Sequence, residues 1–237
     1  MSLAQHLLNE ASAPYRAAGR YAYYFARGKL ARDPVFEAIL ARGLLTRRAR
    51  ILDLGCGQGL LAALLVAARG ASGAGAWPDD WPPAPQPSNI RGIDLLDRDL
   101  RRARLALTCR AEFVAADVRR TDFGSVDGVV ILDVLQYVDF AEQCRILQRV
   151  RTALIGDGVL LLRIGDAHGG AGFTFGKWVD RVKLLATGQG LGRLHYRSVQ
   201  AWRQLLHATG FYSEAVPMSR GTPFANVLII AKPRPTP

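Results

Sequence analysis

The sequence predicts an α/β fold with a doubly wound, Rossmann-like sheet that is mostly parallel. Between residues 50 and 166, short apolar runs alternate with longer segments of helical periodicity. Unbroken apolar runs are typical of parallel strands that are buried on both faces. Two further apolar runs follow a last helical segment and are joined by the short link 219–224, which predicts an antiparallel pair at one edge. These runs together predict seven strands, with the last one antiparallel.

The first 49 residues predict a helical N-terminal cap. Apolar residues recur at helical spacing in 3–11, and Asp33 followed by Pro34 is the expected start of a helix in 33–45. The intervening segment 13–30 is rich in aromatic and basic residues. We therefore expect a cap over 1–49 and a second domain over 50–237.

The alternating segments define the expected order of elements in the second domain. Strands are expected at 50–54, 90–96, 111–118, 128–135, 158–166, 211–218 and 225–233, and helices at 60–69, 97–108, 140–154 and 198–209 with Gly210 as the cap.

A proline-rich stretch, 70–89, interrupts the alternation between the first helix and the second strand. It contains five prolines and the two tryptophans Trp77 and Trp81. We expect a long inserted loop, either a lid or docking surface built on the tryptophans or a mobile linker.

Composition limits the class of protein. The chain has 237 residues, of which 49% are hydrophobic, so it can bury a sizeable core. Its longest apolar stretch, 60–68, is too short to cross a bilayer, and no secretory signal is recognisable, which predicts a cytoplasmic protein. Three cysteines without metal-type spacing argue against a disulfide framework and a zinc site.

The net charge of +11 suggests an acidic partner, namely nucleic acid, an anionic metabolite or an acidic carrier protein. It does not choose among them. Nearly all of the positive charge is arginine, which the codon bias of a GC-rich genome also produces. No basic run is interleaved with aromatic residues as a single-strand binding surface requires.

The stretch ILDLGCGQGL, 51–60, is the strongest functional signal. Gly55, Gly57 and Gly59 follow the first predicted strand, where glycines allow a tight turn and a close approach by a ligand. Asp53 at the strand end repels a pyrophosphate but suits an ammonium or sulfonium group. The loop therefore favours a cationic cofactor over a dinucleotide.

Three more strands end in a carboxylate. Asp94, Asp117 and Asp133 follow the second, third and fourth predicted strands, so all four acids are expected at one edge of the sheet. Asp94 is placed to accept hydrogen bonds from ribose hydroxyls, and Asp117 lies within reach of an adenine amine.

These motifs resemble those of the class I S-adenosylmethionine-dependent methyltransferases over about residues 45–232. The resemblance implies S-adenosylmethionine as cofactor and S-adenosylhomocysteine as product. The residues that it assigns to the cofactor are Asp53, Gly55, Cys56, Gly57 and Gly59 for the methionine end, Asp94 with Leu95 for the ribose (Asp97 as fallback), Asp117 with Val118 for the adenine, and Asp133 with Val134 near the methyl group.

The segment before the first strand commonly folds over the cofactor in this superfamily. By that resemblance, Tyr15 or Tyr21 touches the cofactor, and the aromatic residues with Arg16, Arg20, Arg27 and Lys29 shape a pocket for an aromatic or anionic acyl group. The alternative is an amphipathic helix packed on the sheet. A weaker resemblance is to methyltransferases of bacterial aryl polyene and fatty-acid-type synthesis clusters.

Methyl transfer from a sulfonium requires alignment and desolvation, and a catalytic base is optional. Asp166 and His168 after the fifth strand are the first candidates, His195 and Tyr196 are a second pair, and Tyr137 follows the fourth strand.

The expected acceptor is a small molecule, either an aryl group or an acyl group on an acyl carrier protein. No motif for methylating base amines or cytosine carbon is present, so nucleic acid is less favoured. An RNA methyltransferase and a non-catalytic cofactor-binding module remain the alternatives, and a nicotinamide-dependent oxidoreductase is the least favoured.

Overall fold

Seven strands form one mixed sheet in the computed structural model, which describes residues 3–167, 169–186 and 193–235. The strands are β1 (Arg50–Leu54), β2 (Asn89–Asp94), β3 (Glu112–Ala115), β4 (Val126–Leu132), β5 (Leu154–Gly165), β6 (Phe211–Pro217) and β7 (Asn226–Pro233). Their order is β3-β2-β1-β4-β5-β7-β6, and β7 runs antiparallel to both of its neighbours. The predicted fold class is confirmed. The strand order reverses between β1 and β4, which is where ligands bind in sheets of this kind.

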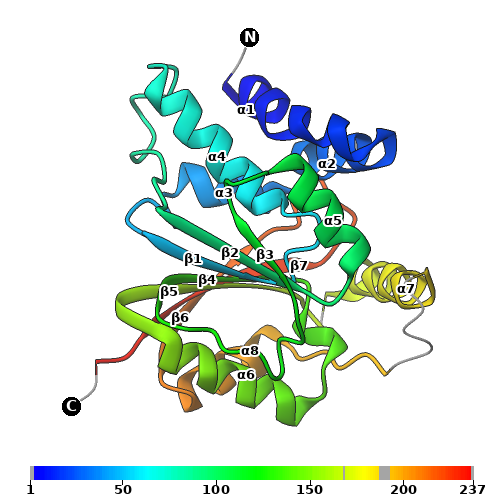
Figure 1. Cartoon of the computed structure of the whole chain (residues 1–237). Coiled ribbons are helices and arrows are strands. Elements are labelled where there is room, and N and C mark those ends of the chain that lie inside the picture. The colour runs from blue at the N-terminus through cyan, green and yellow to red at the C-terminus, as the bar shows by residue number, and fades with distance from the viewer. Residues whose placement is uncertain (1–2, 168, 187–192, 236–237) are drawn as a thin grey trace.

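Helices cover both faces of the sheet (Figure 1). Helices α3, α4 and α5 lie on one face with α1 and α2 beyond them, and α6 and α8 lie on the other. The helix bounds are α1 (Leu3–Ser12), η1 (Ala13–Ala18), α2 (Arg20–Arg32), α3 (Pro34–Ala41), α4 (Leu60–Gly73), α5 (Asp97–Ala106), η2 (Leu135–Tyr137), α6 (Phe140–Ala153), α7 (Gly170–Ala186) and α8 (Val199–Ala208). Helix α7 lies at the carboxyl ends of the strands, outside both layers (Figure 1).

Side-chain caps explain where three helices begin. Asp33 accepts a hydrogen bond from the Val35 amide before α3, as its position before Pro34 predicts. Asp139 caps α6 through the Glu142 amide, and Ser198 caps α8. Each cap satisfies an amide that would otherwise lack a partner at the first turn.

The proline-rich insertion differs from its predicted bounds and role. Helix α4 continues to Gly73 because Ala71 is buried against the core, so the loop covers 74–88. Trp77 donates to the Pro82 carbonyl and meets Trp81 edge to face, and both rings pack on the core. The hydroxyl of Thr46, which precedes β1, donates a hydrogen bond to the Pro83 carbonyl. The loop thus lies at the opposite end of the sheet from α7 (Figure 1), and the prediction of a lid is wrong.

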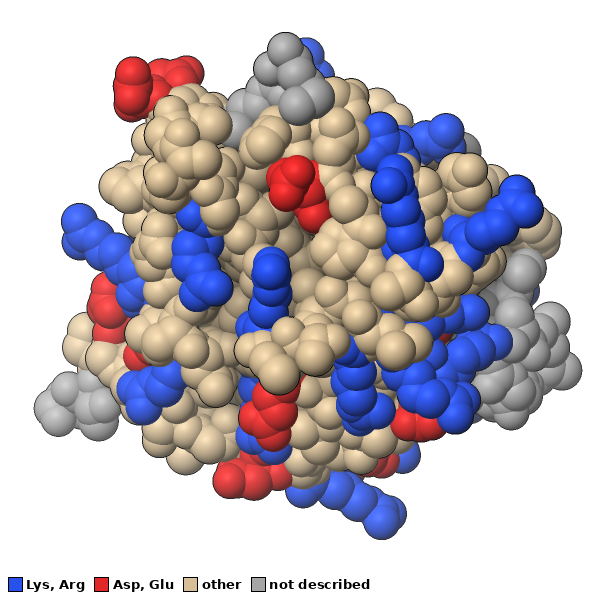
Figure 2. Space-filling model, turned by 45° about the horizontal axis from the view of Figure 1, so that its top comes forward, with Lys and Arg blue, Asp and Glu red and all other residues tan. Residues whose placement is uncertain are grey.

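Positive side chains are prominent on one face of the molecule. On the face in Figure 2, Lys and Arg plainly outnumber Asp and Glu and occur over most of the view. Within the described residues, no helix has the length and apolar character required to span a membrane.

One buried cation joins the N-terminal helices to the sheet. The guanidinium of Arg163 on β5 is 2% exposed and pairs with both carboxylate oxygens of Asp133 after β4, with Nε at 2.9 Å from Oδ1. It also pairs with Asp33, which Lys29 contacts at 2.7 Å. Burial opposes ionisation of Asp33, but the Arg163 and Lys29 charges hold the pKa of this carboxyl below its usual range. Three segments far apart in the sequence therefore meet at a single ionic cluster.

Replacing Arg163 by Met is expected to lower the free energy of unfolding by about 3–5 kcal/mol, because two largely buried carboxylates would lose their partner. Urea unfolding followed by circular dichroism measures the change. Arg48→Met is the matched control, since its partner Asp157 is exposed and the pair is worth less than about 1 kcal/mol. Equal losses in both variants would contradict the assigned role of Arg163.

Candidate functional site

Residues 55–59, the glycine loop, join β1 to α4 in a conformation that requires glycine. Gly55, Gly57 and Gly59 have φ angles of 77°, 53° and 75°. A Cβ at Gly55 would lie 2.1 Å from Val134 Cγ2, and one at Gly59 would lie 2.7 Å from the Phe113 ring. A Cβ at Gly57 would meet nothing within 4 Å. Two of the glycines therefore allow tight packing, whereas Gly57 leaves the loop open to a ligand.

Two carboxylates beside this loop, Asp53 and Asp94, have no ion-pair partner among the described residues. Asp53 is 5% exposed, and burial followed by the negative charge of Asp94 raises its pKa to about 7. Asp94 accepts hydrogen bonds from the Gly57 and Leu96 amides, each at 2.8 Å. Within the described ranges neither acid forms an ion pair with Lys or Arg. Two neighbouring acids of this kind favour the binding of a cationic group beside them.

Cys56 is part of the glycine loop, and its thiol is buried against β2. A Cβ at Gly92 on β2 would be 2.7 Å from its sulfur, so the absence of a side chain there makes room for it. Burial and the two acids Asp53 and Asp94 raise the pKa of Cys56 well above its usual range. Leu95, the next predicted cofactor residue, is 55% exposed after β2.

The other two predicted acids are already paired. Asp117 accepts three hydrogen bonds from the Arg119 side chain, and these lower the pKa of the carboxyl. Asp133 is paired with Arg163 and has a left-handed φ of 58°. The four carboxylates lie at or just after the ends of four neighbouring strands, and Asp53 and Asp94 are the two that form no ion pair with the described residues.

Valine residues follow these paired acids. Val118 is buried, and its carbonyl accepts from Arg149. Val134 packs on Gly55, which brings the loop after β4 onto the glycine loop.

The two N-terminal tyrosines have different positions. Tyr15 is fully buried and donates to the Gln58 carbonyl at 2.7 Å, so η1 covers the glycine loop. The Gln58 Oε1 atom is buried and has no hydrogen-bond partner among the described residues. Tyr21 is 62% exposed and contacts the Phe25 ring and the Arg102 guanidinium. Tyr15 therefore contacts the predicted cofactor loop directly.

A cavity of about 640 Å³ opens between α2, α7 and the segment 221–226. We call it the α2–α7 cavity. Its walls include the aromatic and polar residues Phe25, Lys29, Asp33, Asp133, Gln136, Phe173, Phe175, Lys177, Asp180, Tyr196 and Phe224. Asp133 links this cavity to the strand end that the sequence associates with the methyl group.

Asp180 on α7 is the centre of a polar cluster in this cavity. Its carboxylate accepts hydrogen bonds from Tyr137 at 2.8 Å and from Tyr196 at 2.7 Å, with the Gln136 amide at 3.4 Å. Burial, together with the Asp180 charge, raises the pKa of both tyrosines, so they remain neutral donors. Sequence reasoning missed Asp180, although it is the one acid in the segment 170–186.

Two other base candidates, Asp166 and His195, do not line the cavity. The Asp166 carboxylate accepts from the Val199 amide at the start of α8. His168 lies outside the described residues. The His195 ring meets the Phe140 ring edge to face at 5.2 Å, while its neighbour Tyr196 joins the Asp180 cluster. Of the predicted candidates, Tyr137 and Tyr196 are thus brought together.

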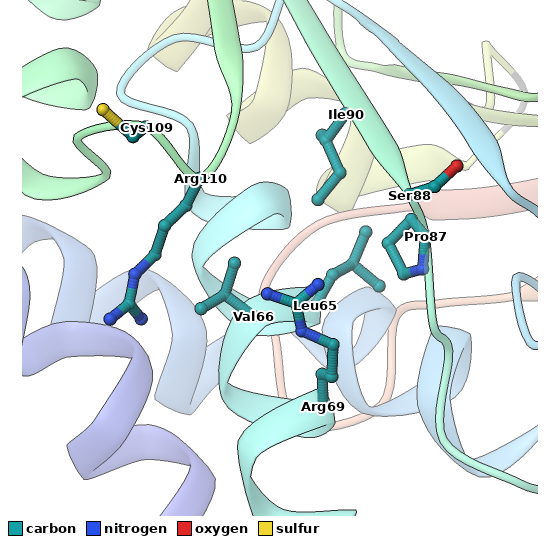
Figure 3. Close-up of a pocket in the computed structure, with 8 residues that line it drawn as sticks. All are labelled: Leu65, Val66, Arg69, Pro87, Ser88, Ile90, Cys109 and Arg110. Atoms are coloured by element: carbon teal, nitrogen blue, oxygen red, sulfur yellow. The ribbon is translucent and has the colours of Figure 1, made fainter.

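A smaller hollow of about 140 Å³ lies between α4, the start of β2 and the turn after α5. Figure 3 shows that Arg69 and Arg110 extend in different directions and that the Cys109 sulfur points away from the other side chains. The polar groups of this hollow do not converge on one point.

The chain belongs to the methyltransferase domain family, whose family model matches residues 20–216. Its fold and cofactor are those of the class I S-adenosylmethionine-dependent methyltransferases. Among curated proteins, none matches the sequence at a significant level.

Solved structures with a similar fold include one biosynthetic protein and two methyltransferases. The pyocyanin biosynthetic protein PhzM is 20% identical with a TM-score of 0.60, and the alignment covers 94% of this chain and 62% of that chain, so this chain spans less than two thirds of PhzM. Magnesium protoporphyrin IX methyltransferase from Synechocystis PCC 6803 with bound SAH is 19% identical (TM-score 0.59; 91% and 88% covered). A methyltransferase from Mesorhizobium loti is 20% identical (TM-score 0.59; 84% and 96% covered).

The glycine loop fits S-adenosylmethionine on three structural grounds. Gly57 leaves space for a ligand, Asp53 and Asp94 supply negative charge without a protein countercharge, and Gln58 Oε1 is a buried acceptor without a partner among the described residues. These groups suit a ligand with an ammonium, a sulfonium and ribose hydroxyls.

Cofactor affinity is expected to rise with pH up to about 7. In the ligand-free chain, Asp53 is protonated below about pH 7, whereas an unfolded Asp ionises near pH 4. The folded state therefore holds the extra proton between these values, and its stability falls as pH rises from about 4 to 7. A bound cation favours the ionised carboxylate, so binding below pH 7 releases a proton. Calorimetric titration in two buffers with different ionisation enthalpies measures this release. Asp53→Asn should abolish it, and proton-free binding by the unmodified protein would contradict the assignment.

Gly57→Ala is expected to weaken cofactor binding at least roughly tenfold, because the new methyl group enters the ligand space and the left-handed backbone costs about 1–2 kcal/mol. Gly156→Ala is the control, since Gly156 has a φ of 55° and a Cβ at this position would likewise meet nothing within 4 Å. Both variants should lose similar stability in thermal unfolding, but Gly156→Ala should bind the cofactor normally. Equal affinities would show that Gly57 does not face the ligand.

Proposed function

We propose that the protein transfers the methyl group of S-adenosylmethionine to a hydroxyl oxygen of a small aromatic acceptor held in the α2–α7 cavity. The observation that carries this proposal is the Asp180 cluster with its two tyrosines. The volume of about 640 Å³ is within the range of small-molecule sites. Phenylalanines from α2, α7 and the segment before β7 supply flat apolar walls for an aromatic ring.

The cofactor supplies a methyl group on a positively charged sulfur. During transfer the carbon–sulfur bond breaks, a carbon–oxygen bond forms, and the acceptor hydroxyl loses a proton. Asp180 is the proposed acceptor for that proton, because it is the carboxylate in the cavity whose hydrogen bonds come from neutral donors. Asp133 and Asp33 are less suitable, since Arg163 neutralises both.

Tyr137 and Tyr196 are positioning residues in this proposal. Their hydroxyl groups donate to different oxygens of Asp180, which fixes the plane of the carboxylate. The N-terminal cap contributes Phe25 to the cavity and Tyr15 to the glycine loop, so it encloses both ligands. Enclosure excludes water and aligns the reacting atoms, the main requirements for methyl transfer.

The acceptor could reach the cavity in two chemical forms. The first is a free phenol or aryl acid, which the cavity dimensions support. The second is the same aryl group attached to an acyl carrier protein, which the net charge of +11 supports through attraction to an acidic protein.

A methyl-transfer screen separates these versions. Radiolabelled S-adenosylmethionine is supplied with phenols, aryl acids, aryl groups on carrier protein, and RNA. Label in a phenol or in its carrier-bound form supports the proposal, whereas label in RNA alone would replace it. No transfer to any acceptor by a protein that binds the cofactor would favour a non-catalytic module.

Asp180→Asn is expected to lower kcat by roughly 10²–10⁴, because the amide cannot accept the proton. Cofactor affinity should stay within the error of calorimetry. Tyr196→Phe should cost less and alter the pH profile, since it removes one donor to the base. Tyr212→Phe on β6 is the control, as Tyr212 is 61% exposed. Full activity of the Asp180→Asn variant would exclude Asp180 as the base.

A further inference from the structure

Two helices carry five of the ten large apolar side chains that are exposed within the described residues. Tyr21, Tyr24 and Phe25 lie on α2, and Phe175 and Trp178 lie on α7. Tyr21 stacks on Phe25 with ring centroids 6.0 Å apart, and Phe175 stacks on Trp178 at 6.2 Å. Exposed apolar clusters of this kind mark binding surfaces.

Both aromatic stacks lie at the opening of the α2–α7 cavity. Phe25 and Phe175 line the cavity, yet they are 41% and 43% exposed, so each bridges the interior and the surface. Tyr21 and Trp178 extend each stack outward and are both 62% exposed. The opening is therefore flanked by aromatic rings on two sides. We call the exposed sides of α2 and α7, together with the adjoining Arg16 of η1, the mouth face.

The charges of the mouth face are positive. Helix α2 contains Arg20, Arg27 and Arg32 and no acidic residue, whereas its Lys29 is paired with Asp33. The one acid of α7, Asp180, is turned inward to Tyr137 and Tyr196. Arg16, Arg20 and Arg27 also form no ion pair within the described ranges, and with Tyr23 and Tyr24 they line an open hollow of about 370 Å³.

We propose that the mouth face docks on a bilayer containing anionic lipid, so that the cavity opens to the interface and receives a lipid-dissolved acceptor. Tyr and Trp favour the membrane–water interface, and arginines attract anionic headgroups. The proposal deepens the proposed function, because it rests on the same cavity. A second copy of the chain is a poor occupant, since two positive faces would repel each other. An acidic protein would match the arginines but would leave the exposed Tyr24 and Trp178 rings without an apolar environment.

Vesicle sedimentation tests the proposal with the full chain in the absence of cofactor and acceptor. The protein should bind vesicles of phosphatidylcholine mixed with phosphatidylglycerol, bind pure phosphatidylcholine much more weakly, and dissociate at high salt. Tryptophan emission should shift to the blue on binding, because Trp178 is the most exposed tryptophan described. Trp178→Ala should weaken binding and remove most of that shift.

Matched variants separate this face from net charge. Arg16→Gln with Arg20→Gln should weaken vesicle binding at least roughly tenfold, as two charges are lost at the interface. Arg69→Gln with Arg110→Gln removes the same charge from the hollow in Figure 3 and should leave binding unchanged. Tyr212→Ala is the control for Trp178→Ala.

Three results would overturn the proposal: no binding to the anionic vesicles, equal losses in the two arginine pairs, or arginine-dependent binding of an acidic carrier protein without vesicle binding. The proposed function is tested separately by methylation of a water-soluble phenol without vesicles. Failure of one experiment therefore does not predict failure of the other.

Discussion

The salt bridges of Arg163 determine how the two halves of the site are arranged. This guanidinium is buried between Asp133, which follows β4, and Asp33, which begins α3. Because an unpaired charge at this depth is costly, the N-terminal helices and the sheet are held at a fixed separation. The wall of the α2–α7 cavity is consequently formed before any acceptor binds. The same Arg163 guanidinium pairs with the Asp33 and Asp133 carboxylates, so these two acids are less available to attract a cationic ligand than Asp53 and Asp94.

The site divides its carboxylates by environment. Asp53 and Asp94 lie beside Gly57, and Asp94 accepts a hydrogen bond from the Gly57 amide. Asp117 and Asp133 are paired with Arg119 and Arg163. Asp180 lies on a separate helix, and its hydrogen-bond partners among the described residues, Tyr137, Tyr196 and Gln136, are neutral. The five carboxylates therefore differ in their neighbours although they share one residue type.

Sequence periodicity predicted the sheet well because burial on both faces leaves an unbroken apolar run. The Asp33–Pro34 helix start and the antiparallel closing pair were equally readable, since local residues determine them. The interactions that complete the cavity were not predictable, because Arg163 and Asp33 are 130 residues apart in the sequence. Helix α7 was missed because its glycines and aromatic residues obscure the helical pattern around Asp180. The extent of α4 was underestimated because Gly70 and Gly73 look like terminators, although burial of Ala71 continues the helix.

The packed insertion at 74–88 has a practical consequence. Its tryptophans hold it against the end of the sheet that is remote from α7, while Asp79 and Asp80 at its tip remain exposed. A fluorophore or affinity handle attached at this tip would leave the glycine loop and the α2–α7 cavity untouched. The insertion thus offers a reporter position from which binding at the far end of the molecule can be followed.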